Sequence, residues 1–74
     1  MQVFRCMTTT DGLSETEIRE VEVFIDLLEG YIIEQPLNEF TVEFYSLDRC
    51  NTFIEKMNIE QRRAMFLFSY RKNG

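Results

Sequence analysis

The chain has 74 residues, 45% of them hydrophobic, with seven Phe and three Tyr, so we expect a single domain over residues 1–74 with its own hydrophobic core. It contains no His and no CxxC pair, which argues against a zinc site and against His-assisted catalysis, and we expect neither an enzyme nor a bound cofactor. No apolar run reaches the roughly 18 residues of a membrane span, and no signal-peptide pattern opens the chain. These features favour a cytoplasmic protein in which Cys6 and Cys50 are reduced rather than joined in a disulfide.

The net charge of −5 is distributed unevenly along the chain. Residues 1–48 carry eleven acidic and two basic side chains, a net charge of −9, whereas residues 49–74 carry six basic and two acidic ones, a net charge of +4. The overall acidity argues against a general affinity for nucleic acid. Four basic residues near the C-terminus could either protect an edge strand or contact phosphates, and they are Arg62, Arg63, Arg71 and Lys72.

The first half of the sequence predicts a strand, a turn and a helix. Residues 2–8, QVFRCMT, alternate in the manner of a half-buried strand, and the segment TTDG then turns the chain. Ser14 and Glu17 form a capping-box signature, which predicts a helix that runs to about Glu29 and stops at Gly30. One stripe of this helix is apolar and comprises Ile18, Val21, Phe24, Ile25 and Leu28.

The second half predicts two further strands and a second helix between them. Residues 31–35, YIIEQ, could extend the first helix, but the preceding glycine and the β-prone Tyr-Ile-Ile favour a short strand. Residues 40–45 alternate as a strand, and Ser46 or Asp48 is expected to cap the second helix, with Asn58 in the left-handed position after its end. Residues 63–70 form the last predicted strand. The apolar face of the second helix comprises Leu47, Cys50, Ile54 and Met57, with Phe53 beside it.

This order of elements predicts an α+β fold of the ferredoxin-like βαββαβ type, a four-stranded antiparallel sheet with both helices on one face. If residues 31–35 were helical, a three-stranded βαβαβ variant with a longer first helix would remain. In the ferredoxin-like order the first and third strands are neighbours, so we expect Arg5 and Glu43 to pair across the sheet.

Residues 40–58 contain a Val-Glu-Phe strand followed by a capped amphipathic helix. This stretch resembles the third strand and second helix of an RNA-recognition motif, a family that stacks bases on rings of its open sheet face. At the positions of those rings this chain has Glu39 and Thr41, and Arg5 stands at an apolar position of the family's first strand. The resemblance therefore implies a shared topology and carries over no RNA-binding residue.

The outer face of the first predicted helix is a candidate partner-binding surface. Four carboxylates lie within about 60° of one another around its axis, and Val23 and Leu27 are predicted beside them on the solvent side. Such a stripe could imitate the phosphates of a nucleic acid and attract a basic groove, or it could only keep the protein soluble. The acidic residues of the stripe are Glu15, Glu22, Asp26 and Glu29.

The open face of the predicted sheet is a second candidate surface. Strand alternation turns one set of side chains toward the helices: Phe4, Cys6, Phe40, Val42, Phe44, Phe66 and Phe68. The set expected on the open face is Val3, Arg5, Met7, Thr41, Glu43, Tyr45, Met65 and Leu67. This set is too apolar for a sheet that faces water, and it predicts a contact with a partner protein, with a second copy of the chain or with a covering loop.

These observations predict a non-catalytic binding protein, a small acidic inhibitor or adaptor of the kind that phages and mobile elements encode. Its expected partner is a protein, and specifically a basic nucleic-acid-handling one, rather than a membrane or nucleic acid itself. One alternative is an RNA-recognition-like domain that contacts single strands through Arg5, Tyr45, Arg63 and Arg71. Another is a small homodimeric regulatory or structural subunit that uses its sheet face.

Overall fold

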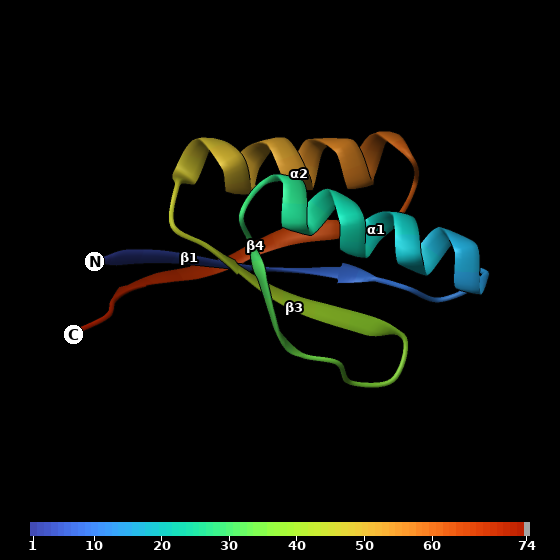
Figure 1. Cartoon of the computed structure of the whole chain (residues 1–74), viewed down its shortest axis with the longest axis horizontal. Coiled ribbons are helices and arrows are strands. Elements are labelled where there is room, and N and C mark those ends of the chain that lie inside the picture. The colour runs from blue at the N-terminus through green and yellow to red at the C-terminus, as the bar shows by residue number, and fades with distance from the viewer. Residues whose placement is uncertain (74) are drawn as a thin grey trace.

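The protein forms one four-stranded antiparallel sheet covered by two helices on the same face (Figure 1). The structure is a computed structural model, and it describes residues 1–73. The strand order β2-β3-β1-β4 confirms the ferredoxin-like βαββαβ arrangement, and residues 31–34 form a strand rather than an extension of the first helix. In chain order the elements are β1 (Gln2–Thr9), α1 (Glu15–Leu27), β2 (Tyr31–Glu34), β3 (Glu39–Phe44), α2 (Leu47–Ile59) and β4 (Ala64–Arg71).

The core lies between the helices and the helix-facing side of the sheet. Alternation along β1 and β3 places Cys6 opposite Val42 and Phe4 opposite Phe44, as their spacing predicted. From the helices, Ile25 of α1 and Phe53 of α2 close this layer, and both are fully buried. The buried cluster as a whole comprises Cys6, Val21, Ile25, Phe40, Val42, Phe44, Cys50, Phe53 and Met57.

The N-terminus of each helix is capped by a serine. Ser14 and Glu17 form the expected capping box, in which the Ser14 hydroxyl accepts from the Glu17 N–H and the Glu17 carboxylate accepts from the Ser14 N–H. The hydrogen bond from the Ser14 backbone N–H is the main reason why the pKa of the Glu17 carboxyl is lowered. For α2 the cap is Ser46 rather than Asp48, since the Ser46 hydroxyl accepts from the Arg49 N–H.

The C-terminal ends of both helices differ from the sequence prediction. The left-handed residue after α1 is Glu29, with φ 58°, and the one after α2 is Gln61, with φ 60°. In both cases the next residue donates a hydrogen bond back into the helix, from Gly30 to Ile25 and from Arg62 to Met57. The predictions that the first helix runs to about Glu29 and that Asn58 follows the end of the second were therefore wrong.

Gly30 and Asn58 have other roles than ending a helix. A Cβ atom on Gly30 would lie 2.5 Å from the Phe44 ring, so the glycine is needed for packing and not for a left-handed backbone. Asn58 lies within α2 and uses its amide group to bind the backbone N–H and C=O of Ala64, at 2.7 and 3.0 Å. Asn58 thereby fixes the start of β4 against the helix.

A β-bulge in β4 changes which of its side chains face the helices. Arg5 is opposite Phe68 and Cys6 is opposite Phe66, so Leu67 is the extra residue. Beyond the bulge the alternation shifts by one, and Phe68 and Tyr70 lie on the open face with Arg5. The sequence prediction that Phe68 faces the helices was wrong, because an unbroken alternation hides the bulge.

The two cysteines lie in the core as free thiols, Cys6 on β1 and Cys50 in the first turn of α2. Both are fully buried. None of the helices formed by residues 1–73 is long and apolar enough to cross a membrane.

Candidate binding surfaces

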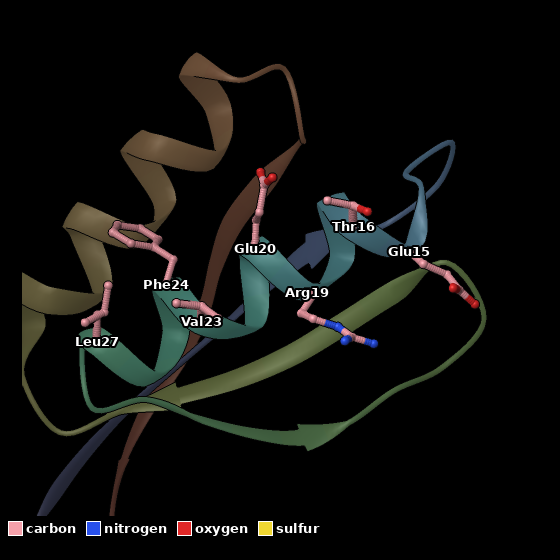
Figure 2. A pocket seen from close by; sticks show the side chains of 7 residues that line it. All are labelled: Glu15, Thr16, Arg19, Glu20, Val23, Phe24 and Leu27. Carbon is pink, nitrogen blue, oxygen red and sulfur yellow. The ribbon is translucent and has the colours of Figure 1, made fainter.

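The outer side of α1 carries a shallow, open groove of about 470 Å³. Val23 and Leu27 are exposed apolar residues of its lining, with 52% and 74% of their surfaces exposed. Figure 2 shows Phe24 and Glu20 directed toward the side of α2, with Arg19 on the opposite side of the helix. The residues that line the groove are Glu15, Thr16, Arg19, Glu20, Val23, Phe24 and Leu27.

This groove exists because the apolar residues of α1 cover more of its circumference than the sheet can bury. Val21 and Ile25 face the sheet and are fully buried, and Phe24 packs against Phe53 of α2 at 6.1 Å between ring centroids. At about 100° per residue, Val23 and Leu27 lie well away from this buried side. Two apolar side chains one helical turn apart thus remain in contact with solvent.

The predicted acidic stripe borders this groove. All four of its residues are exposed, as the helix period predicted. Glu15 also lines the groove, whereas Glu22 and Asp26 lie on the flank of α1 that turns away from α2. Glu29 lies beyond the helix end, where its carboxylate forms an ion pair of 3.3 Å with Arg49. The structure therefore brings Glu15, Val23 and Leu27 into one groove, with Glu22 and Asp26 on the neighbouring flank of α1 and Glu29 beyond the helix end.

The positions of two acids oppose the helix dipole. The last turn of α1 contains Asp26 and no basic residue, and Glu29 follows directly after the helix. A helix C-terminus carries a partial negative charge, which favours Lys or Arg there and disfavours carboxylates. Asp26 therefore does not serve the stability of the helix, whereas the ion pair with Arg49 offsets the unfavourable position of Glu29.

On the open sheet face, Arg5 and Glu43 form the predicted cross-strand pair. The Arg5 Nη2 and Nε atoms donate to one Glu43 oxygen at 2.8 and 3.0 Å, and the Tyr70 hydroxyl donates to the same oxygen at 2.6 Å. Burial of Glu43, which is only 4% exposed, opposes its ionisation, but the hydrogen bonds from Tyr70 and Arg5 prevail and lower the pKa of the carboxyl. The hydrogen bond to Glu43 raises the pKa of Tyr70.

The side chains around this network cover part of the face. The Arg5 guanidinium lies 5.0 Å from the Phe68 ring centroid and 5.7 Å from that of Tyr70. Val3, opposite Tyr70, is fully buried although no helix covers that side of the sheet. Seven of the eight residues predicted for the open face lie there: Val3, Arg5, Met7, Thr41, Glu43, Tyr45 and Met65. The eighth, Leu67, is the bulged residue.

Aromatic rings that the sequence prediction missed also lie on this face. Tyr31 of β2 is opposite Glu43 and packs edge-on against Tyr45 at 5.7 Å between centroids. Phe68 reaches the face through the bulge. Tyr31, Tyr45 and Phe68 each keep between 39% and 57% of their surface exposed. Of the two added rings, only Tyr31 could have been expected from the sequence, because the Tyr31-Ile-Ile pattern predicts a strand. The position of Phe68 follows from the bulge, which the sequence does not indicate.

Neither surface has the chemistry of a metal centre: among the described residues, no group of three or more Cys, Asp or Glu could hold an ion. No protein-family model, curated protein or solved structure matched the chain.

Proposed function

We propose that this chain is a non-catalytic binding protein, an inhibitor or adaptor of the phage or mobile-element kind, that docks through α1 on a basic, nucleic-acid-handling protein in the cytoplasm. The observation that carries the proposal is the exposed Val23–Leu27 pair in a groove bordered by carboxylates. The carboxylates would speed the encounter with a basic surface, and the apolar pair would lengthen the lifetime of the complex.

The placement of the acids supports binding over simple solubility. Asp26 stands in the last turn of α1, where a carboxylate is electrostatically unfavourable, and within residues 1–73 it has no ion-pair partner. A solubilising charge could be carried anywhere on the exposed side of α1. A locally unfavourable carboxylate beside an exposed apolar pair is typical of a functional surface.

A capture experiment with a charge-matched control tests the proposal. The wild type and two triple variants would be used as bait in a nuclease-treated lysate of cells that contain the protein. One variant, E22K/D26K/E29K, reverses the acids beside the groove, and the other, D11K/E34K/E55K, makes the same charge change at exposed residues elsewhere. We expect the wild type and the control to capture the same basic protein and the groove variant to lose it.

The captured protein would then be purified and its affinity measured against salt concentration. The groove variant should bind more weakly and with a flatter salt dependence than the control, since it lacks the charges that face the partner. Equal capture and equal affinity for both variants would show that the acidic stripe is merely solubilising.

A second candidate function is single-strand nucleic-acid binding on the sheet face, which the exposed rings of Tyr31, Tyr45 and Phe68 favour. The Arg5 guanidinium already covers one face of the Phe68 ring, and the overall charge is −5, so this candidate ranks second. Anisotropy with labelled oligouridine at low salt would show binding that R63E and R71E weaken. No binding at low salt would remove this candidate.

The same face is the natural contact for the homodimeric alternative. Light scattering over a range of protein concentrations decides it, because a sheet-to-sheet dimer should dissociate when Phe68 or Met65 is replaced by Asp. A constant monomer mass at high concentration would exclude the dimer.

A further inference from the structure

The outer edge of β4 is open for hydrogen bonding. In the strand order β4 is paired only with β1, and the hydrogen bonds from Thr9 N–H to Arg63 C=O and from Lys72 N–H to Met1 C=O fix this pairing at both ends. Because the bonding direction alternates along an antiparallel pair, the backbone groups of Ser69 and Arg71 point away from β1, as do those of Phe66 before the bulge. Only Ala64 at the start of the strand has its outward groups bound, by Asn58.

The side chains along this edge are apolar and accessible. Four consecutive residues, Met65 to Phe68, are between 41% and 55% exposed. Met65 also lines a second open groove of about 380 Å³, together with its cross-strand partner Met7 and Asn58 of α2. Edge strands of monomeric proteins are ordinarily protected by charges along their length, and this stretch has none.

The charges lie instead at the two ends of the strand. Arg63 precedes β4, and Arg71 and Lys72 are at its other end, all three exposed. Within residues 1–73 none of these three cations has an ion-pair partner. Arg62 differs, since its guanidinium is paired with Glu17 at 3.6 Å and Glu60 at 3.1 Å.

We propose that the edge of β4 binds an extended segment of a partner protein, apolar in its centre and acidic at both ends, as a fifth strand of the sheet. The backbone groups from Phe66 to Arg71 supply the ladder over roughly 20 Å, and Met65 and Phe68 contact alternate apolar side chains of the segment. Since both ends of β4 are basic, acidic ends suit the segment in either direction. This surface is separate from the α1 groove, so the inference does not depend on the proposed function.

Charge also argues against a second copy of the chain as the occupant. Antiparallel pairing of two β4 strands would bring Arg63 of one copy alongside Arg71 and Lys72 of the other, and like charges opposite each other destabilise a sheet. The other edge, β2, is four residues long and interrupted by an irregularity between Ile32 and Glu34, so it offers β4 of another copy little to pair with.

The test uses the intact protein and a labelled synthetic peptide in which Val alternates with Thr between two pairs of Asp. Control peptides carry Lys in place of Asp, or N-methyl groups on the backbone nitrogens of the central residues. By anisotropy at low salt, the Asp-flanked peptide should bind, the Lys-flanked one should not, and methylation should abolish binding while leaving charge unchanged. R71E should weaken peptide binding roughly five- to tenfold. K56E makes the same change of charge at an exposed residue of α2 and should leave peptide binding unaltered.

Hydrogen exchange distinguishes strand addition from mere attraction. Peptide binding should slow exchange of the outward amides of Phe66, Ser69 and Arg71, while those of Phe68 and Tyr70, which face β1, are protected already. S69P, which removes one outward N–H, should lower the affinity for the peptide. Failure of the Asp-flanked peptide to bind, equal binding of the methylated peptide, or self-association through β4 seen by light scattering would each overturn the proposal.

Discussion

At the residue scale, Glu43 shows how a carboxylate can be buried on a sheet face that no helix covers. Three donor atoms of Arg5 and Tyr70 converge on one of its oxygens, and no buried side-chain polar atom of residues 1–73 is left without a partner. A buried charge with this many hydrogen bonds contributes specificity to the register of β1, β3 and β4.

E43Q should therefore lower the free energy of unfolding by about 1–3 kcal/mol at neutral pH. The folded-state pKa of Glu43 lies below its ordinary value. The ionised carboxylate therefore stabilises the fold at any pH above the ordinary pKa, and this contribution is lost as the pH falls through the folded-state pKa. Urea unfolding gives the free energy of unfolding of wild type and E43Q at neutral and acidic pH. The difference between the two proteins should become smaller on acidification. A difference that stays constant over this pH range would contradict a stabilising role of the ionised Glu43 carboxylate. E34Q, the same substitution at an exposed residue, is the matched control.

Substitutions at Gly30 and Gln61 should change the stability of the protein in opposite directions. G30A should destabilise the protein by about 1–3 kcal/mol, because the added Cβ meets the Phe44 ring, which is itself packed against Phe53 at 5.4 Å. Q61G should stabilise it by up to about 1 kcal/mol, because Gln61 has a left-handed backbone. Thermal unfolding of both variants checks this, and the opposite order of melting temperatures would refute it.

At the scale of secondary-structure elements, the two ends of α1 respond oppositely to charge. D26K removes an acid from the last turn and places a lysine four residues after Glu22, so we expect a gain of about 0.5–1 kcal/mol in the free energy of unfolding. E15K removes an acid from the first turn, where it is favourable, and should cost a similar amount.

Both variants should weaken binding to the partner of α1, although D26K should raise the stability and E15K should lower it. An effect on binding can therefore be distinguished from an effect on stability. Urea titrations give the two stabilities, and capture of the partner gives the two affinities. If capture followed stability, with D26K binding as well as wild type, the acidic face would have no direct part in recognition.

The elements themselves could be predicted from sequence, but the C-terminal ends of the helices and the bulge in β4 could not. Capping residues and apolar periodicity are local, and they identified all six helices and strands and the Arg5–Glu43 pair. Gly30 was expected to end the first helix, but its missing Cβ instead allows a close approach to the Phe44 ring, which is distant in sequence. The bulge at Leu67 depends on pairing with β1, so the rings that it turns to the open face were also missed.

At the scale of the whole molecule, the two cysteines report on the integrity of the fold. They come from opposite layers, β1 and α2, and both are fully buried. A hydrogen bond to Cys50, together with burial, raises the pKa of the Cys6 thiol and disfavours its reactive thiolate.

Both thiols should therefore react with a chromogenic disulfide only when the whole domain opens. For a small domain with a stability of about 5 kcal/mol, this slows the reaction by roughly 10³-fold or more relative to the unfolded chain. The rate of colour development in buffer and in urea measures the difference. Rapid modification of one thiol in buffer would show that α2 separates from the sheet on its own.

The pairing of β1 with β4 has a consequence for the order of folding. β1 lies inside the sheet beside β4, from which it is separated by all the other elements, and Met1 and Lys72 exchange hydrogen bonds at one end of this pair (Figure 1). Such distant pairing slows folding, because a long loop must close before the contacts form. A circular permutant that joins Lys72 to Met1 through a short linker and opens the chain at Gly12 would turn β4 and β1 into a hairpin. This rearranged chain should reach the same structure faster than the natural order does.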